Sequence, residues 1–248
     1  MDVLNITTHC GKMTDIRSIS TSTKLNERCR ENAKIKGSIC EHCYAEALCN
    51  LRPSLSKALE RNTHLLRSGP LLPEQIPDVS PDEIFRFEAF GDLNNYQQLE
   101  NYVTIAKANP KTVFALYTKC YDWIKYYFDA FDPPKNLVIV LSSLMVNTPL
   151  DPEKVLGSTY AKFAPSQIKI FTVYTKEYLK KHPEVSINCG SRSCFKCRKC
   201  YNPNNGIVHM SEILKSDQTI VERWINWDKP EFRAKAATQI EDIMNMEV

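Results

Sequence analysis

The fold class follows from the pattern of residues 112–143, TVFALYTKCYDWIKYYFDAFDPPKNLVIVLSS. It contains an apolar run at 112–118, a helical pattern at 121–130 and a second apolar run at 137–143. The runs are almost continuously apolar, which is typical of strands that are covered on both faces. A helix between two such strands predicts a parallel pair joined by a crossover connection.

The same alternation of apolar runs and helical patterns extends along the chain. It predicts one α/β domain with about six mostly parallel strands covered by helices. The sheet is either an open doubly wound sheet or a full or partial (β/α) barrel. Further strands are expected at 2–7, 84–90, 168–175 and, more weakly, 185–188, and further helices at 54–67, 96–108, 152–163 and 176–181.

Composition excludes several classes of protein. The 248 residues carry 32 Lys and Arg against 29 Asp and Glu, so the net charge of +3 does not indicate a nucleic-acid partner, although one is left open. No segment reaches the roughly 18 apolar residues of a membrane span. No secretory signal is recognised, so we expect no membrane partner and a cytoplasmic protein. With 7 glycines and no Gly-rich loop after a strand, the common nucleotide-binding motifs are not found.

Four cysteines crowd residues 188–201, NCGSRSCFKCRKCY, in a C-x4-C-x2-C-x2-C spacing. Clustered thiols in a cytosolic protein are more often metal ligands than disulfides. Structural zinc usually takes two separated C-x2-C pairs, whereas one winding loop suits a four-iron cluster. We therefore favour iron and sulfide, with a zinc knuckle as the alternative. The expected ligands are Cys189, Cys194, Cys197 and Cys200.

A second cysteine group lies upstream and offers two triads. Cys29, Cys40 and Cys43 give C-x10-C-x2-C, whereas Cys40, Cys43 and Cys49 give C-x2-C-x5-C. We prefer the first, because Cys49 lies in a helical pattern and is expected to pack as a small buried residue. Three thiolates leave one iron of a four-iron cluster without a protein ligand. Such an iron can bind and reduce a ligand such as S-adenosylmethionine.

The remaining cysteines, Cys10 and Cys120, have no partner at metal-ligand spacing. We expect both to be buried thiols.

Polar residues follow three of the predicted strands. Carboxyl ends of parallel strands meet at one edge of a sheet, where active sites of α/β proteins are built. Glu88 inside an apolar run must be paired or face a cavity, and Asp92 either receives a ligand ammonium or caps the helix that begins near Asn95. We take Glu88 and Asp92 as candidate catalytic residues. The candidate cofactor-binding residues are Gly91, Asp92, Thr118, Ser142 and Ser143.

Three segments read together carry a resemblance to a known family. They are residues 18–48, SISTSTKLNERCRENAKIKGSICEHCYAEAL, residues 85–119, and the cysteine block with its downstream GIVHMSEI. This pattern resembles the phage-associated gene product eighty-eight family over roughly residues 19–213. That family is in turn similar to divergent radical S-adenosylmethionine enzymes.

The resemblance implies a TIM-barrel-like partial barrel with two [4Fe-4S] clusters. It implies that Cys29, Cys40 and Cys43 hold the reactive cluster, and that the later quartet holds an auxiliary one. It also implies S-adenosylmethionine, a radical abstracting hydrogen from a substrate that the sequence does not name, and an electron donor such as flavodoxin or ferredoxin. We expect a barrel core at 19–187, an auxiliary-cluster block at 188–214 and C-terminal helices at 215–248.

Two other functions remain open at this point. The chain could be a non-enzymatic zinc-binding or structural-cluster module that contacts nucleic acid or protein through the Lys and Arg around the quartet. It could also use an open iron for redox or Lewis-acid chemistry without a radical.

Overall fold

The computed structural model describes residues 3–215. Their centre is a six-stranded parallel sheet in which every strand lies beside its neighbour in the sequence, in the order β1-β2-β3-β4-β5-β6. The predicted α/β fold with parallel strands is therefore confirmed. The helices expected at 215–248 lie outside the described residues. The strands are β1 (Arg17–Ile19), β2 (Ile84–Phe87), β3 (Val113–Thr118), β4 (Leu137–Ser142), β5 (Ile168–Tyr174) and β6 (His209–Ile213).

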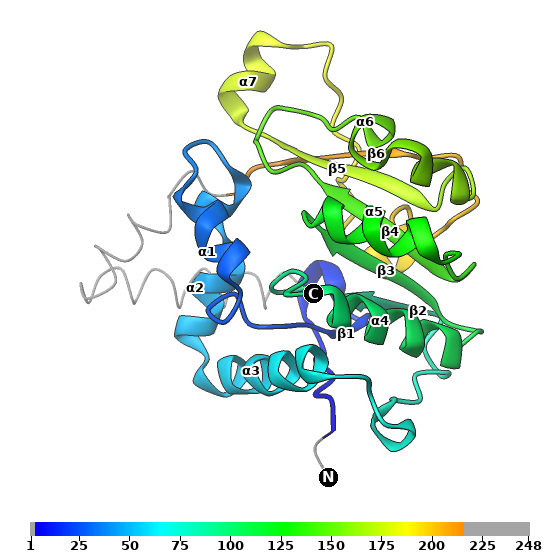
Figure 1. The fold of residues 1–248 in the computed structure, drawn as a ribbon. Helices are drawn as coiled ribbons and strands as arrows, with labels where there is room; N and C mark the ends of the chain where they lie inside the picture. The colour runs from blue at the N-terminus through cyan, green and yellow to red at the C-terminus, as the bar shows by residue number, and fades with distance from the viewer. Residues whose placement is uncertain (1–2, 216–248) are drawn as a thin grey trace.

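The helices connect the strands and form a row of their own. α3 packs on α4, α4 on α5 and α5 on α6, in the same order as the strands. Figure 1 shows α4 and α5 in front of the sheet, and α1 and α2 beside it. The helices are α1 (Glu27–Lys34), α2 (Tyr44–Leu51), α3 (Pro53–Ser68), α4 (Tyr96–Ala108), α5 (Tyr121–Ala130), α6 (Pro152–Leu156), α7 (Lys176–Lys181) and α8 (Cys194–Cys197), with 3-10 turns η1 (Gly11–Met13), η2 (Ile39–His42), η3 (Pro73–Gln75) and η4 (Gly157–Lys162).

The strand order discriminates between the two kinds of sheet that the sequence allowed. A doubly wound sheet needs a point at which the strand order reverses, so that helices cover both faces. The order β1 to β6 contains no reversal among the described strands. Because parallel crossovers are almost always right-handed, an unbroken order places the connecting helices on one face.

Apolar side chains cover both faces of the sheet, and the two covers differ. On one face, side chains such as Phe87, Phe114 and Ile139 pack against the helix row. On the other face, Val138, Val140 and Met210 pack against residues of the cysteine block 189–207. All six residues of β4 are buried, as a central parallel strand requires. The face of the sheet opposite the helix row is called the inner face below. The cysteine block covers it in place of a second layer of helices.

Two predicted strands are wrong and two observed strands escaped prediction. Of residues 2–7, the described part makes only one isolated bridge, between Thr7 and Ser18, and no strand forms at 185–188. The two strands that the sequence did not predict are β1 and β6, which lie at the two ends of the sheet. Both are short or partly polar, because an end strand has only one neighbour and is less buried than a central one.

The helix predicted at 152–163 is interrupted. α6 ends at Leu156, and Gly157 has φ +58, so a 3-10 turn completes the segment. This left-handed backbone cannot continue an α-helix.

Within residues 3–215, the structure contains no helix of the length and apolar character that crossing a bilayer requires.

Candidate functional site

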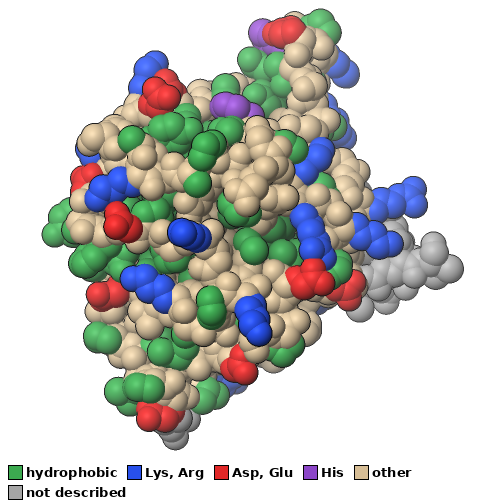
Figure 2. Space-filling view, turned by 90° about the vertical axis from the view of Figure 1, so that its right-hand side faces the viewer, with side chains coloured by type: hydrophobic (Ala, Val, Ile, Leu, Met, Phe, Trp, Pro, Cys, Tyr) green, Lys and Arg blue, Asp and Glu red, His purple; other side chains and the backbone are tan. Residues whose placement is uncertain are grey.

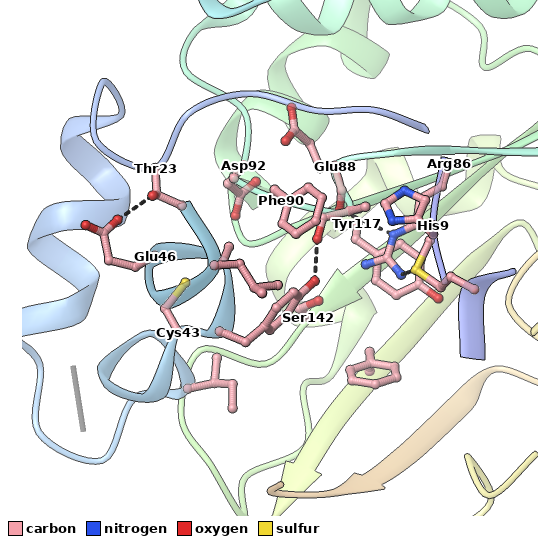
Figure 3. A pocket seen from close by; sticks show the side chains of 18 of the residues that line it. His9, Thr23, Cys43, Glu46, Arg86, Glu88, Phe90, Asp92, Tyr117 and Ser142 are labelled. Atoms are coloured by element: carbon pink, nitrogen blue, oxygen red, sulfur yellow. Dashed lines mark hydrogen bonds between the residues drawn. The ribbon is translucent and has the colours of Figure 1, made fainter. Parts of the chain in front are cut away.

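A large pocket opens at the carboxyl ends of the strands. Its volume is about 1880 Å³, and both cysteine groups line it. In Figure 3, Cys43 lies at one side of the pocket, and Arg86, His9 and Tyr117 lie at the other. Segments about 150 residues apart thus meet over one end of the sheet, as the direction of parallel strands predicts.

Three short elements present the upstream cysteines. Cys29 lies in the first turns of α1, where its backbone N–H donates to the Asn26 side chain that caps the helix, at 3.2 Å. Cys40 lies in η2, which Ser38 caps in the same way. Cys43 closes η2 and immediately precedes α2. The ten-residue spacer is therefore occupied by a helix and a turn that return Cys40 toward Cys29.

Lys119 and Asp92 lie beside this triad. Burial, the Asp92 charge and the other two thiols raise the pKa of Cys29 well above its ordinary value. Burial lowers the pKa of Lys119, but the charges of Cys40, Asp92 and the other two triad thiols outweigh this effect and raise the pKa. These mutual effects are those of like and opposite charges that lie near one another at the same pocket. Lys119 is half-buried at the pocket.

The downstream cysteines form the second wall. Cys194 and Cys197 are the ends of the single-turn helix α8, which Ser193 caps, and Arg198 follows it in a left-handed conformation with φ 51. Cys200 is buried, and burial raises its pKa to about 11 against the effect of a Tyr117 hydroxyl contact. The Lys12 ammonium donates to the Cys189 Sγ at 3.1 Å and to Glu212 at 2.9 Å.

In the part of the chain that the structure describes, the cysteine sets offer sulfur donors but no compact single-ion site. Within residues 3–215, no group of three or more His, Cys, Asp or Glu side chains is compact enough as it stands to hold a metal ion. All ten cysteines of the chain are free thiols. By donor chemistry, two sets of soft sulfur ligands with cations beside each suit a thiolate-bound group. The expected ligands are thus brought to one pocket, without a preformed single-ion site among the described residues.

Glu88 is buried, but its carboxylate does not face a barrel mouth. It accepts hydrogen bonds from Tyr102 at 2.6 Å, Gln98 at 2.6 Å, and the Thr21 hydroxyl and N–H at 3.0 and 3.1 Å. Its φ of +60 turns the side chain toward α4. Burial raises the pKa of Glu88 to about 8, against the bonds from Tyr102 and Thr21.

Asp92 joins the ends of two strands. One carboxylate oxygen accepts from the Thr118 hydroxyl at 2.6 Å, and the other accepts from the Lys119 N–H at 2.9 Å. It does not cap α4, because Asn95 is the N-cap there. Thr118 is buried and holds Asp92, so its hydroxyl is directed to that carboxylate.

The other predicted cofactor-binding residues lie around the same edge. Gly91 has φ +77, and a Cβ there would lie 2.4 Å from the Thr21 carbonyl oxygen, so glycine is required. Ser142 and Ser143 line the pocket. The Ser143 hydroxyl shares a hydrogen bond with Thr172 at 3.1 Å, and the Ser142 carbonyl accepts from Tyr121.

The three cysteines outside the two sets have different positions. Cys49 is 3% exposed and packs with Leu59 and Phe90, and Cys120 is fully buried, as expected for both. Cys10 is exposed, so the expectation of a buried thiol is wrong there. It precedes η1 and lines the pocket.

Sequence reasoning missed the cations and aromatic residues of the inner face. Arg86 lies on β2 with its guanidinium carbon 3.7 Å from the centre of the Tyr117 ring. His9 donates to or accepts from Ser18 at 2.7 Å, and burial together with the Arg86 charge lowers its pKa to about 4. The sequence did contain a signal for Arg86. It is the one charged residue in the apolar strand run IFRF, and its neighbours in that strand are buried.

The family model described as Gene product 88 matches residues 7–219. No curated protein and no solved structure matches the chain.

Proposed function

Because the chain belongs to the phage-associated gene product 88 family, and because the seven cysteines of the two sets line one pocket, we propose an iron-sulfur protein similar to radical S-adenosylmethionine enzymes. The observation that carries the proposal is this convergence. Cys29, Cys40 and Cys43 lie on one wall, and the residues from Cys189 to Cys200 lie on another. Each wall has a lysine beside its thiols, which favours thiolates.

The proposed architecture is a partial (β/α) barrel. Unbroken strand order, one row of helices and a pocket at the carboxyl ends support it. A partial barrel leaves a lateral opening, and here the cysteine block packs against its inner face.

Each cysteine set has a distinct role in the proposal. Three ligands at Cys29, Cys40 and Cys43 would leave one iron of a [4Fe-4S] cluster open, and four at the quartet would leave none open. When bound, the open cluster would supply reductive cleavage of S-adenosylmethionine, with flavodoxin or ferredoxin as the class of electron donor. The auxiliary cluster would relay electrons or anchor the substrate.

The chain's own residues would position the sulfonium cofactor beside the triad. Ser142 and Ser143 present polar groups at the pocket edge, and Gly91 allows the loop after β2 to approach Thr21. Asp92 keeps Lys119 beside the thiols through its bond to the Lys119 N–H. Glu88 stands behind this edge, where its four hydrogen bonds hold the loop in place.

The second candidate is a zinc-braced or structural-cluster module that binds nucleic acid or protein. Exposed Arg192 and Lys196 beside the quartet favour it. Arg198 is used internally, since it pairs with Glu83 at 2.5 Å, and Lys199 donates to the Asn188 carbonyl. The face in Figure 2 mixes basic and acidic side chains instead of presenting a continuous basic surface. Binding to nucleic acid that weakens steeply with salt would favour this candidate.

Metal and sulfide analysis of anaerobically purified protein separates the two candidates. We expect about eight irons and a similar amount of sulfide per chain, as two four-iron clusters require. About one or two zinc ions without sulfide would refute the proposal in favour of the binding module.

A further inference from the structure

We infer that Arg86 anchors an oxyanion group on a flat, aromatic ligand that binds in the pocket between the two cysteine walls. The binding site depends only on described side chains. To name its ligand as the substrate rests on the proposed function.

Arg86 lacks a carboxylate counter-charge among the described residues. Arg17, Arg28 and Arg198 pair with carboxylates, at 2.8, 2.5 and 2.5 Å. Arg86 has no such partner within residues 3–215, although it is half-buried. Its Nε donates to the Glu88 carbonyl at 3.3 Å, and its Nη1 reaches only the weakly accepting Met13 sulfur at 3.4 Å. A partly buried guanidinium without an anion is unfavourable, and a carboxylate would satisfy its remaining donors in a planar pair.

At the same place, the Tyr201 hydroxyl has no acceptor for its proton among the described residues. Tyr201 is 3% exposed, lines the pocket, and hydrogen-bonds through its buried hydroxyl to none of the described residues. Burial raises the pKa of Tyr201, and the Arg86 charge and the approach of its guanidinium to the Tyr201 oxygen act against that rise. Buried hydroxyls are normally hydrogen-bonded, so this one is poised to donate. A donor beside a guanidinium recognises an oxyanion.

Aromatic side chains line the pocket around Arg86. His9 and Phe90 have ring centres 5.7 Å apart, and Tyr117 and Phe171 have ring centres 5.9 Å apart. Figure 3 places His9, Phe90 and Tyr117 around Arg86. Rings at such distances bury flat, apolar surface well. The guanidinium then fixes one end of the ligand and the rings contact its faces.

The quartet is the competing partner for Arg86. Cys194 is one of the groups whose charge raises the pKa of Arg86, behind the tyrosines and against burial. If Arg86 served only to compensate the negative charge of the quartet thiolates, its substitution would alter metal retention and leave anion binding unchanged. The two roles therefore predict different results for one variant.

The test is calorimetric titration of the full chain with benzoate, with benzamide as the uncharged comparison. We expect benzoate to bind at least tenfold more tightly than benzamide. Arg86→Gln should weaken benzoate at least tenfold, and Arg86→Lys by an intermediate factor, because lysine keeps the charge but not the fork. Arg28→Gln is the matched control, since Arg28 lines the same pocket but is paired with Asp122, and it should change binding less than twofold.

Chemical modification covers the case in which Arg86→Gln does not fold. Phenylglyoxal should modify Arg86 of the unaltered chain, as located by mass spectrometry, and benzoate should protect it. Undetectable benzoate binding, equal binding to Arg86→Gln, or modification without protection would each overturn the inference. Iron and sulfide measured on the same samples keep the proposed function separate: benzoate binding to a chain without iron would refute only that function.

Discussion

The Lys12 ammonium lies 3.1 Å from the Cys189 sulfur, although 177 residues separate the two in the chain. The same ammonium contacts Glu212 of β6 at 2.9 Å. Burial opposes the charge, but the bonds to Glu212 and Cys189 raise the pKa of Lys12. The N-terminal segment, the quartet and the last described strand are thus joined at one cation.

Replacement of Lys12 by methionine should lower the reduction potential of the cluster that the quartet is proposed to hold. Without the ammonium, a negatively charged cluster loses a compensating charge. We expect its reduction potential to fall by on the order of 50 mV, about tenfold in the one-electron equilibrium. Potentiometric titration followed by electron paramagnetic resonance measures this shift. Lys34→Met, at an exposed lysine paired with Glu31, should leave both potentials unchanged.

Removal of a triad thiol should affect one cluster only. Cys29→Ala, Cys40→Ala and Cys43→Ala should each lose about four of about eight irons, as one four-iron cluster contains. The quartet's iron should remain. Cys49→Ala is the matched control, because Cys49 is buried in α2 six residues after Cys43 and should keep full iron content. Loss of iron from Cys49→Ala with retention in Cys29→Ala would show that the other triad is used.

Gly91→Ala should destabilise the fold. The new Cβ would lie 2.4 Å from a backbone oxygen of Thr21, and φ is +77, so strain cannot be relieved by a side-chain movement. We expect the free energy of unfolding to fall by roughly 3 kcal/mol or more in chemical denaturation. Gly69→Ala, where no atom lies within 4 Å of the added Cβ, should change stability far less.

Stability should depend on pH through Glu88. Its folded-state pKa is about 8, above the ordinary value of 4.5, so the folded chain retains a proton that the unfolded chain releases. The resulting stabilisation is present below pH 4.5 and is lost as the pH rises toward 8, at up to about 1.4 kcal/mol per pH unit. Glu88→Gln should lack this slope in denaturation curves between pH 5 and 8. A Glu31→Gln control at an exposed site should retain it, and a wild-type curve parallel to Glu88→Gln would contradict the assignment.

The sequence was sufficient for the elements whose burial is simple. β4 is buried at all six positions and therefore reads as a continuous apolar run, and α4 and α5 follow their helical patterns. β1 and β6 could not be recognised, because three residues, Arg17 to Ile19, or a partly polar run, His209 to Ile213, give no strand signal of their own. Their pairing with neighbours, which sequence periodicity does not report, makes them strands.

The candidate site was predictable only in part. The cysteine spacing identified the residues that meet at the pocket, and the parallel sheet predicted which edge they would share. The orientation of Glu88 depends on one positive φ, which no pattern predicts for a glutamate. The roles of Lys12 and Arg86 could not be predicted, because each contacts residues that belong to other elements and are distant in the sequence.

The open iron can be detected by electron paramagnetic resonance of the reduced, iron-loaded chain, recorded before and after addition of S-adenosylmethionine. An open iron at Cys29, Cys40 and Cys43 predicts that the additive changes the signal of one cluster and leaves the other unaltered, and that Cys29→Ala abolishes the change. Two four-iron clusters whose spectra are both unaffected by S-adenosylmethionine would contradict this prediction.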